Sequence, residues 1–120
     1  MDIVIDADSA VPPYEQVRLR IAELAAGGEL AAGTRLPPVR RLAADLGLAA
    51  NTVARAYREL EQAGLVETRG RAGTLVTARA AATPAAAQRA AQRYAEQAAA
   101  LGLTPQAALD LVRAALQLPG

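Results

Sequence analysis

The order of the motifs between residues 36 and 73 constrains the fold of this chain more than any other feature. Two short helical patterns, at 39–46 and 51–62, are separated by a tight turn at Gly47. Apolar, strand-like segments then flank a glycine-rich turn with two arginines at 69–73. Helix, turn, helix and basic hairpin, in this order, are the parts of a winged helix-turn-helix. The sequence therefore predicts a mainly α fold with a small β-wing, followed by two C-terminal helices.

Apolar residues are numerous in this chain, but most of them have small side chains. Hydrophobic residues make up 52% of the 120 residues, yet alanine supplies 32 of them, and Phe and Trp are absent. Alanine favours helices but buries little surface. We therefore expect a thin core and a need for a partner.

Several classes of chemistry are excluded by composition. The chain has no Cys and no His, which excludes disulfides, thiol and imidazole catalysis and the usual zinc sites. Neither a secretion signal nor an apolar run of membrane-spanning length is visible, so the expected location is the cytoplasm, away from membranes. We expect no cofactor and no bound metal.

The net charge of +1 conceals a gradient along the chain. Residues 1–34 carry two arginines against six acidic residues, −4, whereas residues 35–79 carry eight arginines against four, +4. Residues 80–120 come to +1. The positive charge thus coincides with the predicted helix-turn-helix, as neutralisation of phosphates requires.

The remaining segments divide the chain into two expected domains. The alternation in Asp2–Asp6 predicts a short strand, and the apolar spacing after Pro12-Pro13 predicts a first helix that ends at Gly27-Gly28. Residues 77–82 are expected to form a hinge. The winged helix-turn-helix would then occupy residues 1–78 and a helical dimerisation region residues 79–120.

The third helix has two distinct faces. An apolar stripe is predicted to face inward, and it consists of Val53, Ala56, Tyr57 and Leu60. The opposite stripe is polar and basic, with Asn51, Arg55, Arg58 and Gln62. Such a helix suits a DNA major groove; the alternative is an ordinary solvated face.

The turn between the two strand-like segments is expected to form the tip of the wing. Arg69, Gly70 and Arg71 would there meet phosphates or a minor groove, although Arg-Gly turns also occur as inert loops.

The C-terminal region contains two helices that cannot enclose a core of their own. Thr83-Pro84 and Thr104-Pro105 predict their first turns. Packing against a second copy of the chain is the expected arrangement, and folding back on the winged domain is the alternative. The residues expected at the interface are Ala87, Ala91, Tyr94, Ala98, Leu101, Leu109, Val112 and Leu116.

Residues 13–78 resemble the GntR family of bacterial transcription regulators. The resemblance rests on an ordered set of motifs, including Pro13-Tyr14-Glu15-Gln16-Val17, Gly33-Thr34-Arg35-Leu36-Pro37, Asn51-Thr52-Val53-Ala54-Arg55-Ala56-Tyr57 and Gly64-Leu65-Val66-Glu67-Thr68-Arg69. The short two-helix tail resembles the YtrA-type branch, which implies a dimer.

The resemblance also implies which residues contact DNA. Arg40 occupies a contact position at the start of the second helix, Thr52 matches a hydroxyl that meets a phosphate, and Arg69, Gly70 and Arg71 fall in the wing. Arg35 is characteristic of the family but could equally hold its loop through a carboxylate. Departures at Pro38, Ala49, Ala50 and Ala54 remove polar groups, so base reading would depend on Arg40, Asn51, Arg55 and the wing.

Our leading hypothesis is a homodimeric, sequence-specific repressor that binds a palindromic site in double-stranded DNA. The alternative is a winged protein-interaction module without specific DNA binding. An enzyme is disfavoured because the carboxylates of Glu59, Glu61 and Glu67 have no accompanying nucleophile, base or metal set. A small-molecule effector is compatible with the sequence but is not indicated by it.

Overall fold

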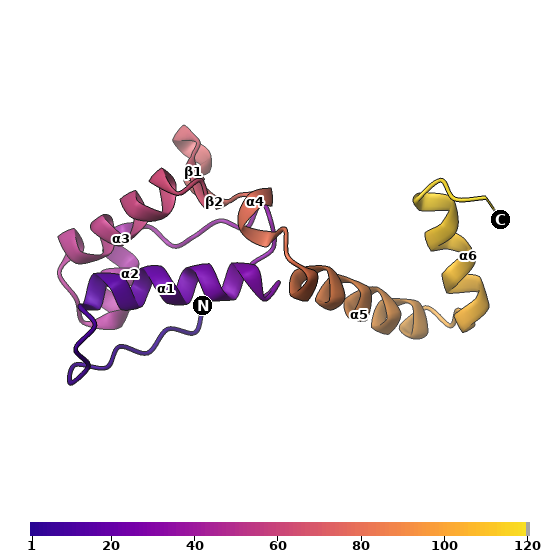
Figure 1. Cartoon of the computed structure of the whole chain (residues 1–120), viewed down its shortest axis with the longest axis horizontal. Coiled ribbons are helices and arrows are strands. Elements are labelled where there is room, and N and C mark those ends of the chain that lie inside the picture. Colours follow the sequence, from indigo (N-terminus) through magenta and orange to yellow (C-terminus); the bar gives the residue numbers. More distant parts are fainter. Residues whose placement is uncertain (120) are drawn as a thin grey trace.

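The structure, a computed structural model, describes residues 1–119. The winged unit consists of three helices, a hairpin and a short fourth helix, and two longer helices follow it (Figure 1). In chain order the elements are α1 (Pro13–Ala26), α2 (Val39–Leu46), α3 (Ala50–Gln62), β1 (Val66–Thr68), the 3₁₀ turn η1 (Gly70–Ala72), β2 (Thr74–Val76), α4 (Ala78–Ala81), α5 (Pro84–Ala100) and α6 (Pro105–Ala115). The predicted fold class, a winged helix-turn-helix followed by two C-terminal helices, is confirmed.

The core of the winged unit lies where α1, α2 and α3 meet. The inward stripe of α3 is buried as the sequence predicted, and Val53 and Ala56 are fully inaccessible to solvent. The apolar face of α1 supplies Val17 and Ile21, which are also buried. Since Ala56 has only a methyl group, α3 can approach its neighbours closely, and the opposite face of α3 is left outward.

Tyr57 connects the core to the loop before α2. Tyr57 is 7% exposed, and its hydroxyl donates a hydrogen bond of 2.7 Å to the carbonyl oxygen of Pro37. Burial raises the pKa of the Tyr57 hydroxyl from 10.0 to about 12, because the charged form is disfavoured away from water.

The wing is a two-stranded antiparallel sheet with a short third segment. Val66 pairs with Val76 and Thr68 with Thr74 across β1 and β2. Residues 34–36 lie along the other edge of β2, where Arg35 forms a bridge with Leu75. The hairpin is therefore held to the loop before α2 by backbone hydrogen bonds, which the sequence did not indicate.

The N-terminal segment corrects one sequence prediction. Residues 2–6 do not form the predicted strand, because no neighbouring strand is available to pair with them. Ile3 nevertheless packs in the core, and the segment runs beside α1 (Figure 1). The side-chain amide of Gln16 holds it, accepting from the N–H of Asp6 and donating to the carbonyls of Asp6 and Val11.

The segment expected to be a hinge, 77–82, contains the short helix α4 instead. Thr77 caps it, accepting a hydrogen bond from the N–H of Ala80, and Ala80 is buried against the winged unit. Three of its four residues are alanine, a strong helix former, and the helix packs against α1.

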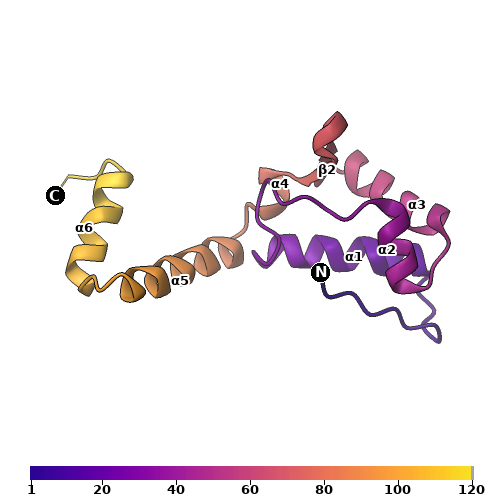
Figure 2. The same cartoon turned by 180° about the vertical axis from the view of Figure 1, so that it is seen from behind.

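The two C-terminal helices extend away from the winged unit (Figures 1 and 2). Thr83 and Thr104 cap α5 and α6 as predicted. The radius of gyration is 17.7 Å, whereas a compact chain of this length would have about 14 Å. Folding back of the tail over the winged unit is thus not observed. None of the helices in residues 1–119 combines the length and apolarity needed to cross a bilayer.

Replacing Tyr57 with Phe tests the contact between the core and the loop. We expect Tyr57→Phe to lower the free energy of unfolding by about 1–3 kcal/mol at pH 7, since the carbonyl of Pro37 loses its donor. The unfolded chain loses the Tyr57 proton near pH 10 and the folded chain only near pH 12, so the tyrosine's contribution is full below pH 10 and is lost between these values. The difference from wild type should therefore narrow at pH 11.

Urea unfolding at both pH values measures this effect. Tyr14→Phe is the matched control, because it keeps the ring over which Arg55 lies. Equal stability of Tyr57→Phe and wild type at pH 7 would contradict the prediction.

Candidate nucleic-acid interface

The outer face of α3 is accessible to a ligand. Asn51, Arg55 and Arg58 are all exposed, while the stripe behind them is buried. In both Figure 1 and Figure 2, α3 and the wing lie on one side of α1, and most of the N-terminal segment lies on the other. Only its first residues, Met1 and Ile3, come near the basic region, where they line a hollow with Arg35 and Arg41, so the outer face of α3 stays uncovered.

The first turn of α3 leaves backbone donors without side-chain partners. Its N-cap residue is Ala49, which makes no side-chain capping hydrogen bond. Thr52 lies on this first turn and is half-buried. Free N–H groups and the positive end of the helix dipole favour an anion such as a phosphate at this end.

Arg55 has a partner that sequence reasoning missed. The carbon of its guanidinium lies 3.7 Å from the centroid of the Tyr14 ring, which comes from the first turn of α1. Tyr14 belongs to the apolar spacing of α1, but it is only half-buried, and its ring supports the arginine. No pattern in the sequence indicates this contact, because it depends on how α1 and α3 approach each other.

Arg40 is exposed on the first turn of α2. The N-cap residue of α2 is Pro38, which has no side chain that could cap the helix. Arg40 thus keeps its guanidinium available at a second uncapped helix start.

The wing carries one paired and one unpaired arginine. Arg69 lies 2.9 Å from Glu67, whereas Arg71 makes no ion pair within residues 1–119. Gly70 has a φ of +48° and is exposed at the tip of the hairpin, a backbone conformation that favours glycine.

Arg35 lies against the base of the wing. A Cβ on Gly73 would meet the Nε atom of Arg35 at 2.9 Å, so the arginine covers the glycine closely. In the part of the chain that the structure describes, no carboxylate lies within ion-pair distance of Arg35, so the suggested carboxylate contact is not observed.

A hydrogen bond also joins the wing to α3. The hydroxyl of Thr68 donates to a carboxylate oxygen of Glu61 at 2.9 Å. The two parts of the basic face are therefore held in one orientation.

The pairing of the arginines distinguishes the basic segment from the rest of the chain. Outside the basic segment, Arg18 pairs with Glu15, Arg20 with Glu23 and Arg89 with Glu29. Of the eight arginines between residues 35 and 79, only Arg69 has such a partner among the described residues. The +4 charge of this segment is consequently available to an external polyanion.

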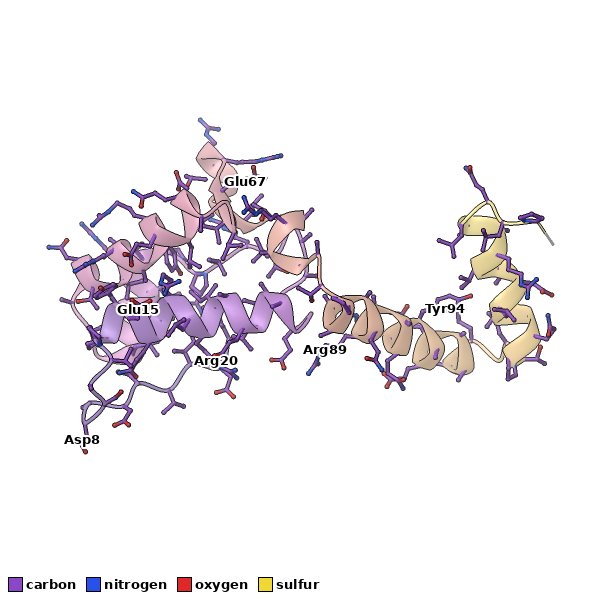
Figure 3. All side chains as sticks on the ribbon, viewed as in Figure 1. Asp8, Glu15, Arg20, Glu67, Arg89 and Tyr94 are labelled. Atoms are coloured by element: carbon purple, nitrogen blue, oxygen red, sulfur yellow. The ribbon has the colours of Figure 1, made fainter. Side chains whose placement is uncertain are left out.

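The residues expected at a dimer interface occupy two environments. Tyr94 lies in the angle between α5 and α6 (Figure 3) and donates a hydrogen bond of 2.8 Å to the carbonyl of Ala108, beside the buried Ala98. Ala87, Ala91 and Leu101 remain exposed on α5. On α6, Val112 is half-buried, and Leu109 and Leu116 are exposed.

Comparison with known proteins identifies the winged unit. Residues 13–76, from α1 to the end of β2, match the model of the bacterial regulatory proteins of the gntR family. The chain belongs to the GntR family. The members of this family are bacterial regulatory proteins.

Individual relatives agree with this assignment. The chain is 53% identical over 73 residues to the HTH-type transcriptional regulator Rv1152 of Mycobacterium tuberculosis, covering 61% of this chain and 60% of that protein. It is 41% identical over 78 residues to the HTH-type transcriptional repressor YtrA of Bacillus subtilis, covering 65% of this chain and 60% of that one. The match thus spans about three fifths of each relative.

A solved structure supports the fold. YtrA from Sulfolobus acidocaldarius, a GntR-family transcription factor, is 38% identical with a TM-score of 0.60, covering 63% of this chain and 80% of that chain.

Retention on heparin tests whether the unpaired arginines form the polyanion-binding face. The double variant Arg58→Ala/Arg71→Ala should elute at clearly lower salt than wild type, because both groups lack partners. Arg18→Ala/Arg20→Ala removes the same charge from ion-paired positions and should elute close to wild type. Equal shifts for the two variants would show that only total charge matters.

Proposed function

We propose that this chain is a homodimeric repressor that binds a palindromic operator, with α3 of each copy in a major groove and the wing on the adjacent backbone. The observation that carries the proposal is the set of exposed, unpaired arginines on α2, α3 and the wing. The same groups support sequence reading, because arginine can donate two hydrogen bonds to guanine in the major groove.

The contacts divide into positioning and reading contacts. The uncapped start of α3 with Thr52, and the wing with Gly70 and Arg71, suit phosphates. Asn51 and Arg55 on the outer face of α3, and Arg40 on the first turn of α2, have the side chains that read base edges. Phosphate contacts would supply most of the affinity, and the reading groups would supply selectivity.

A second copy is the partner that best fits the exposed tail. Five leucines on the last twenty residues are exposed: Leu101, Leu109, Leu111, Leu116 and Leu118. Single exposed leucines are common, but five of them within the last twenty residues, four on or just after α6, are more typical of an interaction region. Two copies joined there would present two α3 helices, which matches a site with two half-sites.

Arg40→Ala tests the proposed reading contact. We expect it to weaken binding to the operator by roughly ten- to a hundredfold, equivalent to about 1–3 kcal/mol. Arg18→Ala, which removes an arginine already paired with Glu15, should change the affinity less than about threefold. Fluorescence anisotropy on genomic fragments selected by the protein would measure both; equally small effects would contradict the placement of Arg40.

A charge placed on the tail tests the proposed dimer. Leu109→Asp should convert the protein to a monomer in sedimentation velocity, because an unpaired carboxylate would be buried between the copies. Leu19 on α1 has a similar exposure, 42% against 46% for Leu109, so Leu19→Asp is the matched control and should remain dimeric. A wild-type protein that sediments as a monomer at micromolar concentrations would overturn the proposal.

A further inference from the structure

The junction between α1 and α5 is built from one shared side chain. The hydroxyl of Thr83 accepts a hydrogen bond of 3.1 Å from the N–H of Ala86, which caps the start of α5. The same hydroxyl donates to the carbonyl oxygen of Ala26, the last residue of α1. A single group thus satisfies one backbone donor of α5 and one backbone acceptor of α1.

The two helices also meet through backbone contact. Gly28 follows α1 with a φ of +82°, and a Cβ there would lie 3.0 Å from the Cα of Ala86. Ala86 is 8% exposed, so the contact is closed to solvent. Since neither residue has a side chain that could yield, the distance between the helices is set by hard contacts.

Two arginines of α5 reach back to the same turn. Arg93 donates to the carbonyl oxygen of Gly28 at 3.1 Å, and Arg89 lies 3.0 Å from the carboxylate of Glu29. Figure 3 shows Arg89 at the place where α1 and α5 meet. Arg89 and Arg93 are one helical turn apart, so together they restrain rotation of α5 about its own axis. An exposed ion pair stabilises little by itself, but here it adds orientation to the close contact.

We propose that this junction, formed by Gly28 and Glu29 with Thr83, Ala86, Arg89 and Arg93, determines the spacing of the two half-sites that the dimer accepts. The inference rests on the proposed function, since it concerns how two copies are placed on one DNA duplex. The junction joins the winged unit to the helices that would bind the second copy. Its geometry would therefore set the distance between the two winged units of the dimer.

Because α5 is long, a small change of angle at the junction moves its far end by a large distance. With 17 residues, α5 is about 25 Å long at 1.5 Å per residue. A tilt of about 10° at the junction would move its far end by about 4 Å, more than the rise of one base pair, about 3.4 Å. A small change at Gly28 would therefore be enough to shift the second winged unit by a base pair.

Ala86→Leu is the variant that tests this inference. A leucine side chain at position 86 would collide with Gly28 and should displace α5. The core of the winged unit would keep all of its side chains. Ala85→Leu makes the same change at an exposed neighbouring position and is the matched control. Arg93→Ala, which removes only the bond to Gly28, should have a smaller effect in the same direction.

The first measurement requires no DNA. Because the chain contains no cysteine, Ala72→Cys in the wing and Gln97→Cys near the end of α5 can be spin-labelled specifically. Labelled chains diluted with unlabelled chains then report one distance within a chain. We expect a narrow distribution for wild type and Ala85→Leu, and a shifted or broadened one for Ala86→Leu. An unchanged narrow distribution in Ala86→Leu would overturn the inference.

The second measurement uses operator fragments whose two half-sites are moved apart or together by one base pair. Wild type and Ala85→Leu should lose more than about tenfold in affinity at the wrong spacing, because one half-site is then out of reach. Ala86→Leu should prefer another spacing or discriminate less than about threefold. If it keeps the wild-type preference, the inference is wrong. If wild type itself binds no fragment selectively, the proposed function fails, and the inference fails with it.

Discussion

The close packing of α3 against α1 is the contact on which the rest of the structure depends. Ala56 and Val53 are completely buried against the apolar face of α1, which supplies Val17 and Ile21. Because the inner stripe of α3 is apolar and buried while the opposite face is polar, α3 has one favourable rotation about its axis. That rotation decides which polar side chains face outward, and the wing is attached to the end of the same helix. A core with few large side chains is sufficient here because the helices approach closely.

The winged unit and the two C-terminal helices are stabilised in different ways. The winged unit has a continuous core, whereas α5 and α6 contribute only Ala86 and Ala98 as buried apolar residues among those described. The tail is nevertheless helical, which the high helix propensity of alanine and the threonine caps at Thr83 and Thr104 explain. The tail thus has a defined backbone but an exposed apolar surface and almost no core of its own.

The sequence predicted the helices well because their ends are encoded locally. Thr83-Pro84, Thr104-Pro105 and Gly47 specify starts and stops through capping and backbone conformation, and the structure has them at those places. The strand predicted at residues 2–6 was wrong because a strand needs a neighbour, which no local pattern reveals. The bridge between Arg35 and Leu75 was not predicted for the same reason, because it too depends on which segments become neighbours in the fold. Within the candidate site, the outward face of α3 followed from periodicity, but the support of Arg55 by Tyr14 depends on the approach of two helices and could not be read from spacing.

The stacking of Arg55 on Tyr14 affects the thermodynamics of association. A free arginine side chain has many rotamers, and holding it in one of them costs up to about 2 kcal/mol of conformational entropy. The ring of Tyr14 restricts the guanidinium while the protein is still alone in solution. Part of that entropy is thus lost when the polypeptide folds, and correspondingly less remains to be lost when a ligand arrives.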